Sequence, residues 1–205
     1  MFAGLLVTGI VAGLIGSNDQ LLTDITENPV IMIVVIVAQL GLVITISAAI
    51  NRLSPALALT LFFVYAATVG VTFALIFELY TTQSIFTTFL LTSAMFGAVG
   101  LWGYVTKRDL SAMGTFLFMA LFGLIAASIV NLFIANEAIY WITTYAGVLI
   151  FAGLTAYDMQ KIKGFAKAGL SGAEEQRASI MGALALYLDF INLFLFLLRI
   201  FGQQR

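Results

Sequence analysis

The sequence predicts an all-α integral membrane protein with seven transmembrane helices, and three observations lead to this prediction. Hydrophobic residues make up 62% of the 205 residues and charged residues only 9%, whereas soluble domains carry about a quarter charged residues. The mean hydropathy is +1.09. The apolar residues form continuous runs near the length of about 20 residues that a helix needs to cross a bilayer. The chain therefore has room for one transmembrane domain, residues 1–205, and for no separate soluble one.

Polar breaks and capping residues set the predicted helix ends. The first helix is expected over about residues 2–16, followed by a polar loop, residues 17–28. Pro29 and Ser54-Pro55 fit the starts of the second and third helices, because proline is tolerated in the first turn and serine is a good N-cap. The helices are thus predicted at about residues 2–16, 29–51, 55–77, 84–104, 111–135, 138–161 and 178–202.

The charged residues between these helices predict the orientation. All Lys and Arg residues before the last helix lie in the breaks that follow even-numbered helices. The breaks that follow odd-numbered helices contain acidic residues and no Lys or Arg. By the positive-inside rule, the basic breaks and the N-terminus are expected in the cytoplasm. A bacterial inner membrane is the expected location. The last helix is expected either to span fully or to form a re-entrant hairpin.

The chain has no cysteine and no histidine. This excludes disulfides, thiolate nucleophiles, cysteine-bound zinc and iron–sulfur clusters, and it removes the commonest metal ligand and near-neutral proton acceptor. Any pH-dependent chemistry must therefore use carboxylates. No cofactor is expected, and no basic run indicates nucleic acid.

Small residues are expected to form the helix contacts, because lipid offers no hydrophobic driving force between helices. Gly9 and Gly13 form a GxxxG pair in the first helix. Gly97, Gly100 and Gly103 recur along the fourth helix. We predict that both sets allow close backbone approach.

Asp189 lies near the middle of the last apolar helix, and it is the first candidate functional residue. A carboxylate at mid-bilayer costs roughly 3 kcal/mol and is expected to face protein or water and to have a partner. Helical spacing places Asn192 and Arg199 on the face of Asp189. The alternative is a neutral structural acid that only donates a hydrogen bond.

Asp158, at the end of the preceding helix, is the expected partner of Asp189. It lies one turn before Lys161, so an ordinary interfacial charge is the alternative interpretation. If the two acids meet, like-charge repulsion makes them share one proton, which is a proton-operated switch. Without that proton they offer hard oxygen ligands suited to Ca²⁺, with Asn192 as a further ligand. Arg52 is a candidate counter-charge, or else a positive-inside anchor.

Four segments carry a resemblance to a known family. They are Ala94–Gly97, Gly103–Ser111, Ala156-Tyr157-Asp158 and Leu186–Phe194. These segments resemble the Bax inhibitor-1 (TMBIM) family, as a bacterial-type member. The resemblance implies seven helices with the C-terminal helix central and wrapped by the other six, and a pH-sensitive Ca²⁺ leak with Ca²⁺ and protons as partners.

The same resemblance implies roles for individual residues. Asp158 and Asp189 would be a di-aspartyl pH sensor, and Arg52 its basic partner from a second helix that moves. Gln39 stands where many relatives carry an acid, and the shorter N-terminus leads us to expect an incomplete first helix. From the residues themselves, Glu78 is a candidate for attracting cations to the outer mouth, or else a solvated loop charge.

We interpret the chain as a passive cation pathway and not an enzyme, and two alternatives remain open. An intramembrane aspartyl protease also needs two membrane aspartates, often with a Tyr-Asp pair such as Tyr157-Asp158. Against it, Asp189 lies in Leu-Asp-Phe, and Pro55-Ala56-Leu57 is on the wrong helix. The other alternative is a non-catalytic membrane protein that modulates protein partners.

Overall fold

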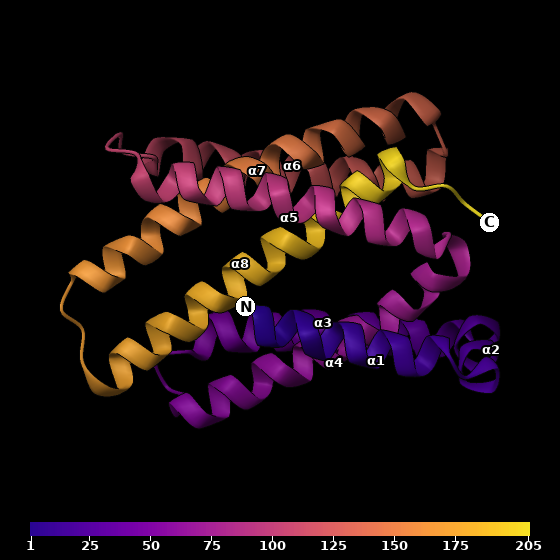
Figure 1. Cartoon of the computed structure of the whole chain (residues 1–205), viewed down its shortest axis with the longest axis horizontal. Coiled ribbons are helices and arrows are strands. Elements are labelled where there is room, and N and C mark those ends of the chain that lie inside the picture. The colour runs from indigo at the N-terminus through magenta and orange to yellow at the C-terminus, as the bar shows by residue number, and fades with distance from the viewer. The chain divides into compact units, whose positions relative to one another are not determined.

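The computed structural model describes residues 1–205 and confirms the all-α membrane class (Figure 1). The chain forms eight helices and has no β-strand. The helices are α1 (Phe2–Gly16), α2 (Asp19–Glu27), α3 (Pro29–Ala49), α4 (Pro55–Leu79), α5 (Thr82–Val105), α6 (Ser111–Ile134), α7 (Glu137–Lys167) and α8 (Gly172–Phe201).

Six helices, α3 to α8, are long and apolar enough to cross a membrane. Helix α1 is only 15 residues long, or about 23 Å at 1.5 Å per residue, which is short of a bilayer core of about 30 Å. It reaches a full span only together with α2, from which it is bent by 95°, giving up to seven spans. Helix α8 is one unbroken helix of 30 residues, so the chain does not end in a re-entrant hairpin.

The prediction of a loop between the first two spans is wrong, because residues 19–27 form α2. Asn18 caps this helix, its side chain accepting a hydrogen bond from the backbone N–H of Leu21 at 3.1 Å. Asn28 then caps α3, with Pro29 in the first turn. The capping supplied by the two asparagines allows a short helix in a segment that reads as polar loop.

Helices α7 and α8 both extend further into their connection than expected. Helix α7 continues to Lys167 instead of about residue 161, and α8 begins at Gly172 instead of about residue 178. Between them, Gly169 and Gly172 have positive φ angles of 65° and 60°. Glycine adopts this conformation without steric cost, so the turn fits into a few residues and leaves its polar flanks helical.

The helices group into two compact units, and the single-domain prediction for residues 1–205 stays a prediction. Unit 1 contains residues 1–82, 169–187 and 203–205, and unit 2 contains residues 83–168 and 188–202. In unit 1, α1 packs on α4 and α3 packs on α4. The Thr8 hydroxyl of α1 lies 2.6 Å from the Tyr187 hydroxyl and donates to the Ala66 carbonyl at 2.9 Å.

Close approach in unit 2 depends on glycines of α5, α6 and α7. A Cβ atom added at Gly103 would lie 2.7 Å from the Cα of Ala156, so α5 and α7 touch backbone to backbone there. At Gly114 it would lie 2.5 Å from the Tyr157 ring, and at Gly147 2.6 Å from the Phe196 ring. These three positions therefore set the spacing of α7 from its neighbours.

The predicted close approach is confirmed at Gly103 and is wrong at Gly9, Gly13 and Gly97. A Cβ atom at Gly9, Gly13 or Gly97 would meet nothing within 4 Å. At Gly100 it would make ordinary contact, 3.4 Å from Met159. Each step of three residues leaves a side chain about 60° from the starting face of the helix. Gly97 and Gly103 are two such steps apart, so they lie on different faces of α5.

We expect Gly103→Ala to destabilise the protein by about 1–3 kcal/mol, as overpacking does, because the new methyl group would meet the Ala156 backbone. Gly97→Ala, on the same helix, is the matched control and should be neutral or slightly stabilising, because alanine has the higher helix propensity. Thermal unfolding in detergent measures both variants. Equal unfolding temperatures would contradict the contact.

Candidate functional site

Helices α7 and α8 bring Asp158 and Asp189 together within unit 2. The two side chains hydrogen-bond each other, and their exposed fractions are only 7% and 4%. Ionised carboxylates can only accept hydrogen bonds. A hydrogen bond between two carboxyl groups needs a proton on one of them, so this contact is sensitive to protonation.

The two acids meet although they lie at different distances from the α7–α8 turn. Asp158 is about 14 Å from the end of α7 and Asp189 about 26 Å from the start of α8, at 1.5 Å per residue. They meet because both residues belong to the parts of α7 and α8 that lie in unit 2.

The pair is buried, and aromatic rings pack around the residue that follows Asp189. Phe190, next to Asp189, makes edge-on ring contacts with Phe89 and Phe96 of α5, at 5.6 and 5.4 Å between ring centroids. Asp189 Oδ2 is buried and has no hydrogen-bond partner. A buried acceptor without a partner costs about 1–3 kcal/mol, and such atoms in native structures call for an explanation.

Two other predicted site residues lie in unit 2. The amide Nδ2 of Asn192 donates to the Leu188 carbonyl at 2.8 Å, within α8, which leaves its Oδ1 available. Tyr157 packs against α6, with its ring 6.2 Å from that of Phe118. Their roles in an ion path stay predictions.

The remaining predicted site residues lie in unit 1. Arg52 is exposed in the turn between α3 and α4. Gln39 Nε2 donates to the Thr68 carbonyl and to Thr72 Oγ1, both at 2.8 Å, and so links α3 to α4. Glu78 is exposed near the end of α4. Their contributions to gating and conduction stay predictions.

The acidic residues alone do not form a metal cage. No group of three or more His, Cys, Asp or Glu side chains gathers anywhere in the chain. Ca²⁺ takes six to eight oxygen ligands. A calcium ion at the Asp158/Asp189 pair would therefore need amide or backbone oxygens and water in addition to the two carboxylates.

Gln160 is a structural residue that the sequence analysis missed. Its Oε1 accepts from the Leu110 N–H at 2.9 Å and its Nε2 donates to the Arg108 carbonyl at 2.8 Å. Both ends of the amide thus hold the α5–α6 loop against α7. The sequence signal that could have identified it is an amide side chain next to Lys161 and Lys163 at the end of a span.

These features define a class: a polytopic helical membrane protein with two buried aspartates in contact between its last two helices. The chain belongs to the Bax inhibitor-1 family, because the family model described as "Inhibitor of apoptosis-promoting Bax1" matches residues 1–205. The resemblance predicted from the sequence is confirmed.

Bacterial relatives agree with this family. The inner membrane protein YbhL of Escherichia coli is 48% identical over all of this chain and 88% of its own length. An uncharacterized protein of Deinococcus radiodurans is 44% identical, over all of this chain and 87% of its length. One from Borreliella burgdorferi is 41% identical, over all of this chain and 89% of its length.

The pair generates a stability prediction. Asp189→Asn should leave folding nearly unchanged, because the new amide can donate to Asp158. Asp189→Ala should lower the free energy of unfolding by about 1–3 kcal/mol, because it leaves the buried Asp158 side chain without its partner. Thermal unfolding in detergent at neutral pH measures the difference. Asp24→Ala, at an exposed position of α2, serves as the control; equal stability of the Asn and Ala variants would refute the pairing argument.

Proposed function

We propose that the protein is a passive cation pathway, with Ca²⁺ as the favoured ion, opened and closed by protonation of the Asp158/Asp189 pair. The observation that carries the proposal is the hydrogen bond between two buried carboxyl groups on α7 and α8. Because that bond needs one proton, the charge of the pair changes when the proton leaves or a second one arrives. A change of charge inside the helices is a switch that pH operates directly.

The chemistry of the pair supports a hard cation. Deprotonation frees carboxylate oxygens, which are the ligands that Ca²⁺ prefers, and Asn192 Oδ1 and helix carbonyls are further oxygen donors. The buried and unpartnered Asp189 Oδ2 supports the same conclusion, since it is an acceptor already removed from water. Ca²⁺ is here the transported ion and not a resident cofactor.

Four further residues complete the proposed path. Arg52 is the counter-charge that competes with cations for the pair, and Glu78 attracts cations at the outer mouth. Gln39 and Tyr157 support the path by fixing their helices, Gln39 through its bonds to α4 and Tyr157 through its packing on α6.

We also propose a bacterial inner membrane as the location, with the N-terminus in the cytoplasm. The Escherichia coli relative is called an inner membrane protein, and the basic loops follow alternate spans as the positive-inside rule requires of cytoplasmic segments. The protein acts without catalysis, because Asp189 lies in Leu-Asp-Phe and not in the Gly-x-Gly-Asp sequence of an intramembrane aspartyl protease.

The central test is Ca²⁺ flux into liposomes across a pH series. Wild-type protein should give a flux that changes with pH, and Asp158→Asn and Asp189→Asn should each alter that profile, because an amide does not titrate and only one titrating carboxyl group is then left in the pair. Asp24→Asn, which removes an exposed acid, should keep the wild-type profile.

A pH profile that is the same in both pair variants as in the wild type would exclude the pair from gating. Cleavage of a reporter transmembrane helix that disappears in either variant would replace the passive pathway with a protease.

The role of Arg52 has its own test. A cation near two carboxyl groups favours their ionised form, so Arg52→Gln should move the pH midpoint of Ca²⁺ flux to higher pH. Arg108→Gln is the matched control, since it removes an exposed arginine from a different loop. If Arg52→Gln and Arg108→Gln gave the same midpoint as the wild type, Arg52 would be an ordinary membrane anchor.

A further inference from the structure

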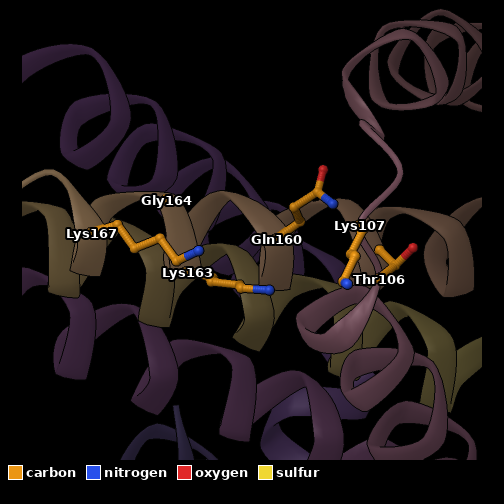
Figure 2. A pocket seen from close by; sticks show the side chains of 6 residues that line it. All are labelled: Thr106, Lys107, Gln160, Lys163, Gly164 and Lys167. Carbon is orange, nitrogen blue, oxygen red and sulfur yellow. The ribbon is translucent and has the colours of Figure 1, made fainter.

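A pocket of about 380 Å³ lies where the α5–α6 loop meets the end of α7 (Figure 2). Its size falls within the usual range of small-molecule sites, roughly 300–1,000 Å³. Six residues line it: Thr106, Lys107, Gln160, Lys163, Gly164 and Lys167. Three of the six are lysines and none is acidic, so the pocket is suited to an anion.

The lysines form a cluster of like charge that lacks a counter-ion in its own lining. Lys163 and Lys167 lie one turn apart on α7, a spacing at which like charges repel. Lys107 adds a third charge from the loop. Figure 2 shows the side chains of Lys163 and Lys167 extending along α7 toward the loop that carries Lys107. An anion bound among them would relieve this repulsion.

The nearest acid in the loop is occupied elsewhere. Asp109 Oδ1 accepts a hydrogen bond from the Ser111 N–H at 2.9 Å, at the start of α6. Hydrogen bonding to Ser111 holds the pKa of Asp109 below its ordinary value. The Asp109 carboxylate thus stays ionised at the end of α6 and does not line the pocket.

The loop side of the pocket is held in place. The two hydrogen bonds of Gln160 fix the loop on α7. Lys163 Nζ donates to the Tyr104 carbonyl and lies 5.1 Å from the centre of the Tyr104 ring. An ammonium group has three N–H donors, so two of those on Lys163 remain for a ligand.

The rim of the pocket distinguishes between a free anion and a lipid. The last turns of α5, directly before Thr106, expose four large side chains: Leu101, Trp102, Tyr104 and Val105, with exposed fractions from 48% to 62%. Tryptophan and tyrosine are enriched where a membrane meets water. A free phosphate ion would make no use of this apolar surface, whereas a phospholipid has both a phosphate group and acyl chains.

We propose that this pocket binds the phosphate headgroup of an anionic phospholipid, whose acyl chains run along the exposed end of α5. Basic pockets at the cytoplasmic side of spans bind such headgroups in other membrane proteins. The inference is separate from the proposed ion pathway and holds whether or not the protein conducts Ca²⁺.

Native mass spectrometry of the detergent-purified full chain tests the proposal, because it counts individual bound lipids. The probe is phosphatidylglycerol, with phosphatidylcholine and inorganic phosphate as comparison ligands. Wild-type protein should bind phosphatidylglycerol more tightly than phosphatidylcholine. Lys107→Gln/Lys167→Gln should weaken phosphatidylglycerol binding about 25-fold, at roughly fivefold for each lysine near the headgroup. This variant keeps Lys163 and its bond to Tyr104.

The matched control is Arg108→Gln/Lys161→Gln, which removes two charges from the same loop and the same helix but outside the lining. It should keep the wild-type affinity, and unfolding temperatures without lipid verify that both double variants are folded. Equal loss in the two double variants would mean diffuse surface attraction and would overturn the site. Inorganic phosphate that bound as tightly as phosphatidylglycerol would overturn the lipid assignment.

Discussion

The structure of unit 2 depends on the contact between two buried carboxyl groups, those of Asp158 and Asp189. Charging an acid inside a membrane costs several kcal/mol, and two adjacent charges would cost more. A hydrogen bond between Asp158 and Asp189 avoids that cost by leaving one group neutral. It also explains why α8 can be the most buried span, with 67% of its apolar window buried, while it carries an acid near its middle.

The pair requires backbones that approach closely, and glycine supplies that approach. Helix α7 meets α5 at Gly103 and meets Phe196 of α8 at Gly147, where a methyl group would collide with the neighbour. Larger residues at these positions would push α7 away from both partners. The distance between Asp158 and Asp189 is therefore set by packing at positions that carry no charge. The position of the Asp158 carboxyl group therefore depends on the glycine contacts of the same helix, α7.

The sequence predicted the helices and the pair because both follow from energetic necessity. Long apolar runs have to be helical in a bilayer, and an acid among them has to find a partner. The sequence could not predict features that depend on how each helix is rotated about its axis and how far it is shifted along its neighbours. Spacing places Gly9 and Gly13 on one face but does not say which face meets a neighbour, and here that face has none. Helix α2, the longer α7 and the loop contacts of Gln160 depend on capping and on side chains that meet only in three dimensions.

Asp158 lies close to the lysines near the end of α7. Lysine side chains reach toward water at the membrane boundary, and Lys161 is exposed. Asp158 lies only about 5 Å further along α7, at 1.5 Å per residue. Asp189 starts from the middle of α8 in sequence, but its contact with Asp158 brings its carboxyl group to the same level of α7. A pair one turn from Lys161 costs less to ionise than a pair at the bilayer midplane, because the cost of a charge falls toward the membrane boundary.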